Sequence, residues 1–485
     1  MMKYDIIIIG SGLGGLTAGA KLSREGKKVL LIEQHDRPGG YATTFKRGDF
    51  ILEVGLHEMN GPSPEDIKTR IFNDLEVFKN VEFIKLPEFY RFINNNYDVT
   101  IPHDPEVAAE RLSALFPQEI NGIKAYFDQL IKPKKKTPGK EGQDKSLGEF
   151  IDSIITTEDL KLILLGNLGY FHDDPYTLSL AYYTAAQGRY FIEGASFIKG
   201  GSQKLSNHLA DFIRNHGGVV LLNHLVTGIK TDDNKVTGIL YKRKNDCGSI
   251  NFEASADELI ANTAIPNVAD LLPGEYGREL KNEITKQNTG ASLLTVYLGF
   301  NTPLKELGYN NYSTFIFDST IKSQKDIFTN NMDDFRSRSF TFVDYGQVDS
   351  GLSPAGKSVG AICCIDYLKD WEGLNRKDYI SKKEMVASVF IKRLEKLIPG
   401  IVNVIEYYEV GTPLTLKRYT LNPGGAVYGF AQTPARTFTD TSRLPENLHF
   451  ASAWGRTGGG FSGAIYGGYL CAVNILRKKP RVVSG

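Results

Sequence analysis

The sequence predicts an α/β protein in which a domain built on βαβ units and a parallel sheet is interleaved with a second domain of mixed sheet and helices. The opening pattern of the chain and its return in two later regions predict this fold. The chain opens with a strand, a glycine-rich turn, a helix and a second strand, and similar patterns return near 196–290 and near the C-terminus. We therefore expect a discontinuous first domain of residues 1–75, 196–290 and 405–485. A second domain, which would bind substrate, is expected to contain residues 76–195 and 291–404.

The first strand, expected over residues 4–9, runs directly into the turn Gly10-Ser11-Gly12-Leu13-Gly14-Gly15, and the second strand ends on Glu33. This order is the dinucleotide-binding fingerprint of a Rossmann-like domain. Gly10 permits the tight turn, Gly12 lets the backbone approach a pyrophosphate, and Gly15 lets the helix lie close to the strand. The N-terminus of the helix offers free N–H groups to phosphates, and Glu33 is expected to accept hydrogen bonds from ribose hydroxyls.

The fingerprint alone does not distinguish FAD from NAD. The doublet Gly39-Gly40, preceded by Arg37-Pro38, follows shortly after Glu33. Two adjacent glycines just past the second strand suit a backbone that folds against an extended cofactor, which favours FAD. No second fingerprint is visible, so a dedicated NAD(P) domain is not expected.

The middle of the chain predicts helices near 105–130 and 147–190, separated by the polar stretch Lys132–Lys140. This stretch is either a solvated surface loop or a basic contact with anionic lipid headgroups. A helix is then expected at 203–215, strands at 219–222 and within 223–262, and turns at 232–234 and 245–246. Further strands are expected at 292–300 and 358–367, and a helix at 382–397.

Composition excludes several classes of function. A net charge of +1 gives no electrostatic reason to expect nucleic-acid binding, and no stretch of about eighteen apolar residues predicts a membrane-spanning helix. Cys247, Cys363, Cys364 and Cys471 show no ligand spacing, which fits a reducing, cytoplasmic compartment. The cluster His172-Asp173-Asp174 has no convincing metal geometry either, so we expect no metal. Cys363 and Cys364 are expected to be buried strand residues.

A glycine-rich segment, residues 454–460, precedes a helix expected from about Ser462 to Arg477. If this helix points at a flavin, its positive N-terminal end would stabilise the negative charge of the reduced ring, with amides from Ser462, Gly463 and Ala464. The alternative is a glycine-rich helix that only packs tightly in the core.

Together, the fingerprint, Gly39-Gly40 and the last helix resemble the FAD-dependent amine-oxidase-like superfamily. Within it, the chain is most similar to the phytoene desaturase, carotenoid isomerase and retinol saturase group. The segments that carry the likeness are Leu31–His35, Glu53–His57, Gly411–Thr415, Gly424–Gly429, Asn447–Ala451 and Gly463-Ala464. One departure concerns the strand before the last helix. The family usually has a Gly-Asp pair there, whereas this chain reads Ala451-Ser452-Ala453-Trp454, without an acid.

The resemblance implies FAD as the cofactor. The residues it places at the cofactor are Gly10, Gly12, Leu13, Gly14, Gly15, Glu33, Gln34, Arg37, Gly39, Gly40, Gly55, Leu56, His57, Val226, Trp454, Gly463 and Ala464. His57 and Glu58 are the candidate catalytic residues, because they are the ionisable residues expected to face the flavin. Tyr428, Trp454, Arg456 and Phe461 are candidates for lining the substrate cleft, although aromatic residues are as readily explained by the core.

The implied function is an oxidoreductase acting on carbon–carbon bonds of a long apolar isoprenoid or polyene, carotenoid- or retinoid-like. Hydride transfer with flavin N5 would give desaturation or saturation. The electron partner stays open between a quinone, oxygen and a separate reductase, and the poorly soluble substrate predicts a peripheral position on a membrane. Three alternatives remain: a carotenoid cis–trans isomerase that uses reduced FAD, a flavin amine oxidase, and a non-catalytic prenyl-binding protein like the GDP-dissociation inhibitors.

Overall fold

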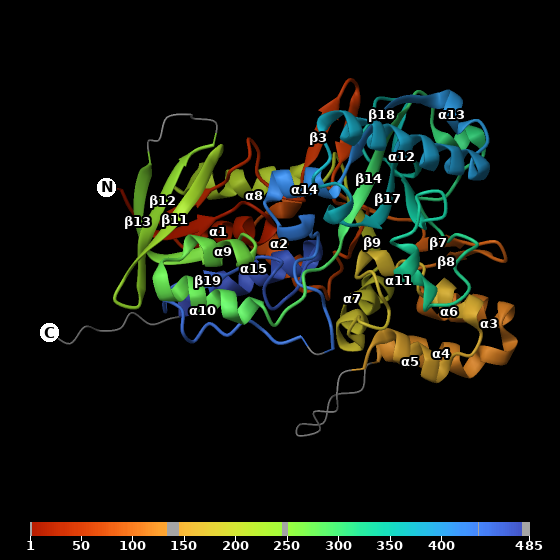
Figure 1. Cartoon of the computed structure of the whole chain (residues 1–485), viewed down its shortest axis with the longest axis horizontal. Coiled ribbons are helices and arrows are strands. Elements are labelled where there is room, and N and C mark those ends of the chain that lie inside the picture. Colours follow the sequence, from red (N-terminus) through yellow and green to blue (C-terminus); the bar gives the residue numbers. More distant parts are fainter. Residues whose placement is uncertain (1, 133–144, 245–250, 435, 478–485) are drawn as a thin grey trace.

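The computed structural model describes residues 2–132, 145–244, 251–434 and 436–477. In this part of the chain, two seven-stranded sheets organise the protein (Figure 1). The first sheet and its helices lie on the side of the molecule where the N-terminus is labelled. The second sheet, with β14, β17 and β18, lies on the other side, together with the helices α3 to α7.

The first sheet has the order β10-β2-β1-β13-β12-β11, and β19 also pairs with β13. Its strands are β1 (Lys3–Ile9), β2 (Val29–Ile32), β10 (Val219–Leu221), β11 (His224–Asp232), β12 (Lys235–Arg243), β13 (Phe252–Ala261) and β19 (Leu448–Phe450). Parallel pairing joins β10, β2, β1, β13 and β19, whereas β12 and β11 are antiparallel. Adjacent strands of the parallel part therefore come from the beginning, the middle and the end of the chain.

The second sheet has the order β18-β14-β17-β16-β15-β7-β8. Its strands are β7 (Tyr90–Ile93), β8 (Asp98–Ile101), β14 (Ser292–Phe300), β15 (Ser313–Ile316), β16 (Phe340–Asp344), β17 (Ser358–Asp366) and β18 (Ile405–Gly411). The pairing of β15 with β7 is parallel and the others are antiparallel, so the sheet is mixed, as predicted. The predicted boundary at 404/405 is wrong for β18, because this strand pairs with β14 and so belongs to the second sheet.

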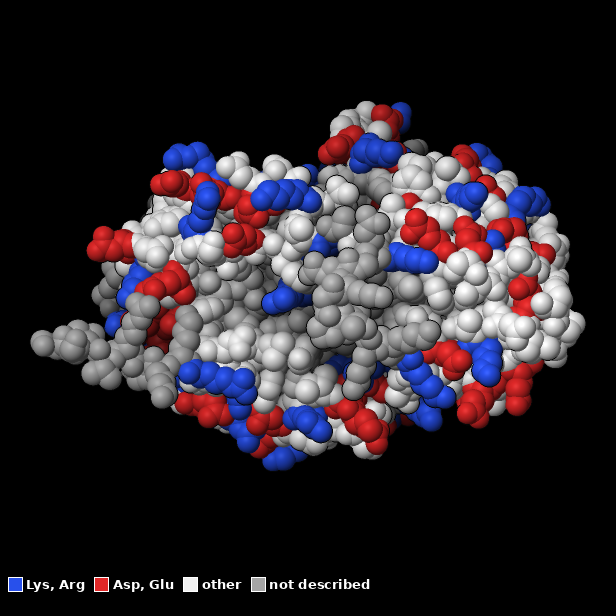
Figure 2. Space-filling model, turned by 90° about the horizontal axis from the view of Figure 1, so that it is seen from below, with Lys and Arg blue, Asp and Glu red and all other residues white. Residues whose placement is uncertain are grey.

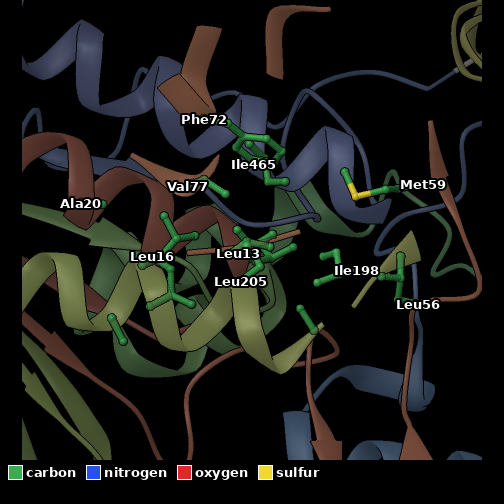
Figure 3. Close-up of a cluster of buried hydrophobic side chains, with 14 of the residues drawn as sticks. Leu13, Leu16, Ala20, Leu56, Met59, Phe72, Val77, Ile198, Leu205 and Ile465 are labelled. Atoms are coloured by element: carbon green, nitrogen blue, oxygen red, sulfur yellow. The ribbon is translucent and has the colours of Figure 1, made fainter. Parts of the chain in front are cut away.

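Three helices cover the first sheet: α1 (Leu13–Arg24), α8 (Gln203–Asn215) and α15 (Gly460–Arg477). Their apolar faces meet in a buried cluster (Figure 3) that includes Leu16 of α1, Leu205 of α8 and Ile465 of α15. The helices α1 and α15 approach so closely that a Cβ at Gly468 would lie 2.0 Å from the carbonyl oxygen of Gly14. Small residues at this crossing set the position of α15.

The remaining helices surround the two sheets. They are α2 (Ile67–Asp74), α3 (Pro105–Leu115), α4 (Ile120–Ile131), α5 (Leu147–Ile154), α6 (Glu158–Leu164), α7 (Leu180–Glu193), α9 (Ile265–Leu271), α10 (Gly274–Ile284), α11 (Asp326–Asn330), α12 (Arg376–Leu397), α13 (Ile401–Val404) and α14 (Pro413–Thr420). Two small sheets complete the fold. They are β3 (Thr44–Arg47) with β4 (Phe50–Glu53), and β5 (Met59–Asn60) and β6 (Phe83–Lys85) on either side of β9 (Ala195–Ile198).

Most local predictions agree with these bounds. The strands at 29–32 and 292–300 and the helix at 203–215 are found as predicted. The helix predicted at 382–397 begins earlier, at Arg376, because the side chain of Asn375 caps it by accepting from the Asp378 amide. Apart from the exposed Lys132, the predicted loop Lys132–Lys140 lies outside the described residues, as do the turn at 245–246 and Cys247.

Cys363 and Cys364 are buried in β17, as predicted, and both are free thiols. None of the helices in the described ranges is long and apolar enough to cross a bilayer. On the face shown in Figure 2, the described Lys and Arg side chains are interspersed with Asp and Glu.

Candidate functional site

The fingerprint turn lies at the carboxyl end of β1. Gly10 has φ +93°, a conformation that side chains rarely adopt, and a Cβ there would lie 2.8 Å from the Asn262 carbonyl oxygen. The Asn262 side chain also holds the turn, because its Nδ2 donates to the carbonyl oxygens of Gly10 at 3.0 Å and Gly12 at 3.3 Å. Gly12 caps α1 without any side-chain hydrogen bond, so no side-chain cap occupies the first amides of this helix.

Glu33 lies buried at the end of β2, beside the same turn. Its Oε2 accepts from the Ser11 amide at 2.8 Å and from the Ser11 hydroxyl at 2.7 Å, while Oε1 accepts from the His35 amide at 2.8 Å. A carboxylate offers about four acceptor positions, so capacity remains for a ligand hydroxyl. The side chain of the next residue, Gln34, donates to the Tyr419 carbonyl oxygen at 3.0 Å.

The glycine doublet Gly39-Gly40 packs directly on the fingerprint turn. Gly39 has φ +129°, and its amide donates to the Ser11 carbonyl oxygen at 2.9 Å. A Cβ on Gly40 would lie 3.4 Å from the Gly12 Cα. The two glycine segments therefore form a wall of bare backbone, which lets a long ligand approach the main chain closely.

The loop that carries His57 and Glu58 is held by Glu53. This buried carboxylate accepts from the amides of Gly55 and Leu56 at 3.2 and 3.1 Å and from both the amide and the hydroxyl of Ser202 at 2.7 Å. Burial raises the pKa of Glu53 to about 7, against the opposing effect of these donors. Leu56 and Met59 on either side of the pair point into the buried cluster of Figure 3.

The two candidate catalytic groups are in different states. Burial lowers the pKa of His57 to about 4, so its imidazole is neutral at pH 7 and lacks the more acidic imidazolium proton. Burial, followed by the charge of Glu88, raises the pKa of Glu58 well above its ordinary value. Both effects favour the protonated form of the Glu58 carboxyl.

A cavity of about 1110 Å³ extends along these segments. Its lining includes most of the predicted site residues: Gly10, Gly12, Leu13, Gly14, Glu33, Gln34, Gly39, Gly40, Gly55, His57, Glu58, Val226, Tyr428, Trp454, Phe461, Gly463 and Ala464. Beyond the glycine wall, the cavity reaches β14 and β17 at Leu293, Cys363 and Ile365. The site is thus built from both sheets.

Four predicted residues do not line this cavity. Gly15 acts in packing, because a Cβ there would lie 2.3 Å from the Gly10 carbonyl oxygen. Leu56 is buried in the core, and Arg37 donates to the Thr44 carbonyl oxygen at 2.8 Å. Arg456 is exposed, with its guanidinium 4.7 Å from the centre of the Phe438 ring.

Several lining residues were not predicted. Asn262 follows an apolar strand directly, and this position was the available signal, because ligands bind at the carboxyl ends of parallel strands. Tyr170, Tyr182 and Tyr190 line the cavity without any motif that marks them. Ser452, adjacent to the position of the missing acid, is buried and lines the cavity, and its hydroxyl has no hydrogen-bond partner among the described residues.

The family model described as flavin containing amine oxidoreductase matches residues 13–476. The chain belongs to this family. Its cofactor is FAD, and the uncapped start of α1, the bare backbone wall and Glu33 fit a dinucleotide of this kind. The fold prediction of a Rossmann-like FAD-binding domain interleaved with a domain of mixed sheet and helices is confirmed.

Two curated relatives span nearly the whole flavoprotein. All-trans-retinol 13,14-reductase of Danio rerio is 24% identical, and the match covers 98% of this chain and 86% of the relative. The chloroplastic prolycopene isomerase of Arabidopsis thaliana is 26% identical over 99% of this chain and 84% of the relative.

Solved structures share the fold at lower identity. An oxidoreductase from Methanosarcina mazei has a TM-score of 0.69 at 16% identity, covering 98% of this chain and all of the other. Putrescine oxidase bound to putrescine has a TM-score of 0.65 at 16% identity and covers 98% of this chain and 99% of the other. These likenesses show the architecture alone.

Proposed function

We propose that this flavoenzyme acts on a carbon–carbon bond of a long apolar isoprenoid or polyene, carotenoid- or retinoid-like, as a saturase or desaturase. One observation carries the proposal. The cavity continues from the fingerprint glycines to an aliphatic and aromatic wall that includes Leu293, Ile365 and Phe171. The names of the relatives, a retinol reductase and prolycopene isomerases, support a polyene substrate.

FAD supplies a hydride donor or acceptor when it is bound. The protein's part is to hold the cofactor, align the substrate chain and exclude water. The backbone of Gly10, Gly12 and Gly40 and the Glu33 carboxylate would hold the dinucleotide end. At the other end, the free Ser452 hydroxyl is our candidate for the contact that an acid makes elsewhere in the family.

The aromatic residues around the cavity suit a flat, conjugated chain. Tyr182 and Tyr190 project from α7, while Tyr428 and Phe461 come from the C-terminal segment, and all four line the cavity. Such rings offer broad apolar surface to a polyene, with the hydroxyl groups of the tyrosines at its margin. Their arrangement from two separate parts of the chain would fix the position of the substrate between the domains.

An amine substrate fits the cavity less well. A protonated amine needs an ionised carboxylate or another strong acceptor, yet burial and the charge of Glu88 both raise the pKa of Glu58 and so disfavour its ionised form. A non-catalytic prenyl-binding role is disfavoured for a different reason, because the uncapped α1 and Glu33 are preserved as a dinucleotide site. Isomerisation with reduced FAD remains the second candidate, since relatives carry that name.

A peripheral position on a membrane is part of the proposal. The cavity lining includes Ile67 at the start of α2 and Arg189 on α7, and both are exposed. Ile67 has 42% of its surface exposed, and Ile192, three residues after Arg189 on α7, has 54% of its surface exposed. The part of the cavity lined by Ile67 and Arg189 is where an apolar substrate would pass between lipid and protein.

Liposome flotation tests this position. We expect the double variant Ile67→Ser/Ile192→Ser to remain at the bottom of the gradient while the wild type floats with anionic vesicles. Val402→Ser, which changes a residue of α13 that is 48% exposed, is the matched control and should float like the wild type. Wild-type protein that stays unbound at low salt would refute the membrane position.

The reaction is tested by anaerobic incubation of the flavoenzyme with all-trans-retinol or prolycopene in liposomes. The flavin spectrum and the product mass are followed together. A gain or loss of two hydrogens with a matching change in flavin redox state supports the redox proposal. An isomer of unchanged mass would support the second candidate, and oxidation of amines with no change in either polyene would overturn both.

A further inference from the structure

Glu58 differs from most buried carboxyl groups in its hydrogen bonding. The residue is only 8% exposed, and neither of its side-chain oxygens has a hydrogen-bond partner among the described residues. Buried polar atoms are normally paired, so an unpaired carboxyl in a cavity wall calls for an explanation. Glu58 is also one of the residues that line the cavity proposed to hold the substrate.

The surroundings of Glu58 come from several parts of the chain. Tyr170 and Tyr190 line the same cavity. Burial raises the pKa of each of these hydroxyls and of Tyr312, in the loop before β15, and the charge of Glu58 adds to each shift. His57, on the same loop as Glu58, is neutral. The charge of the Glu88 carboxylate adds to the effect of burial and further favours the protonated form of Glu58, while burial raises the pKa of Glu88 as well.

Glu88 connects this position with the outside of the molecule. Its side chain is half-buried, and its Oε1 accepts from the Tyr312 amide at 2.7 Å. The hydroxyl of the same Tyr312 donates to the His57 carbonyl oxygen at 2.6 Å. One tyrosine therefore joins the segment of the half-buried Glu88 to the loop of Glu58.

We propose that Glu58 is the acid that protonates a carbon of the substrate, and that Glu88 returns the proton to it from solvent. This inference rests on the proposed function and gives it a direction, toward saturation. Reduced FAD, when bound, would supply the hydride for one carbon of the double bond, and the neighbouring carbon takes the proton of Glu58 as the π bond breaks. Glu58 is left as a carboxylate. The Glu88 carboxylate then takes a proton from water and passes it to Glu58, and Glu88 returns to its ionised form.

An infrared measurement tests the stored proton without any substrate. The flavoenzyme should show the carbonyl stretch of a protonated carboxyl group in apolar surroundings, with a shift in D₂O. Glu58→Gln should remove this band, whereas Glu65→Gln, which changes an exposed carboxyl seven positions along the chain, should retain it. Identical spectra for the wild type and Glu58→Gln would overturn the proposal.

A kinetic measurement tests the transfer, with all-trans-retinol as the probe and enzyme reduced by light before mixing. Because a general acid contributes about 10²–10⁴-fold, Glu58→Gln should slow the first turnover at least ~100-fold while it keeps its flavin. Glu58→Asp should restore part of the rate. In D₂O the wild type should place one deuterium in the product.

The variant Glu88→Gln separates the return of a proton to Glu58 from the transfer of that proton to the substrate. Its first turnover should proceed at nearly the wild-type rate, and later turnovers should slow and become strongly dependent on pH. A first turnover by Glu58→Gln within about threefold of the wild type would overturn the role of Glu58. A wild-type enzyme that converts neither retinol nor prolycopene would overturn the proposed function and the substrate step with it, whereas the infrared result would stand or fall separately.

Discussion

The substitution Gly14→Ala probes the contact that closes the cofactor wall. Gly14 lies in the first turn of α1, where a Cβ would be 1.9 Å from the Ala451 carbonyl oxygen and 2.7 Å from the Asn262 Oδ1. Ala451 follows β19 directly, and its amide donates to the Ala261 carbonyl oxygen at 3.1 Å. The obstructing atom therefore belongs to main chain that is held by the sheet and cannot rotate away.

The expected cost follows from two opposing effects. Alanine gains about 1 kcal/mol over glycine in a helix, whereas overpacking typically costs about 1–3 kcal/mol. Because the new methyl group meets backbone at 1.9 Å, we expect the upper end of that cost and a net loss of about 2 kcal/mol in the free energy of unfolding. Denaturant unfolding measures this loss, and the ratio of flavin to protein after gel filtration should fall with it.

Gly19→Ala is the matched control within the same helix. A Cβ there would lie 2.8 Å from the Ile213 Cδ1 and 3.1 Å from the Ile8 Cδ1, which are the ends of side chains that can move. The same gain in helix propensity applies, so its stability should stay within about 1 kcal/mol of the wild type. If Gly14→Ala is as stable as Gly19→Ala and retains as much flavin, the close approach of α1 to the residue after β19 limits neither stability nor flavin binding.

Three further outcomes are expected. Glu33→Gln should lose most of its flavin and about 1–3 kcal/mol of stability, because an amide NH₂ would face the donors of Ser11 or His35; absorbance ratios and urea unfolding check this. Glu58→Met should stabilise the fold by about 1–3 kcal/mol in urea unfolding, since it removes an unpaired buried carboxyl, and a loss of stability would contradict the unpaired state. The pKa of Glu53, raised from 4.5 to about 7, means that the folded state binds more protons between these values. Its contribution is therefore fully present below pH 4.5 and is lost as pH rises through 7, by about 3 kcal/mol. Urea unfolding across this range should show a flatter pH dependence for Glu53→Gln than for the wild type.

Local patterns predicted the elements that depend on neighbouring residues. The run from β1 to Glu33 and the strand Ser292–Phe300 were predictable because apolar periodicity and glycine spacing act over short stretches. The pairing of β18 with β14 was not predictable, because it joins residues more than a hundred positions apart. The local sequence of β18 does not indicate which strand it pairs with.

The site shows the same division. The backbone groups of the fingerprint turn and of Gly39-Gly40 were predictable, because their role depends on the local conformation of the glycines. Arg37 and Arg456 were placed at the site by their closeness to motifs in the sequence, but the direction of a long side chain depends on its tertiary neighbours. The raised pKa of Glu58 likewise depends on burial and on the charge of Glu88, which no sequence motif records.

The first sheet also sets an order of events during synthesis. Because β13 lies between β1 and β19, the edge that holds the dinucleotide is incomplete until Leu448–Phe450 has been made. The last helix, α15, follows only after that strand. A nascent chain on the ribosome would thus expose the fingerprint long before it could retain flavin, and cofactor loading would report that translation has passed β19 and α15.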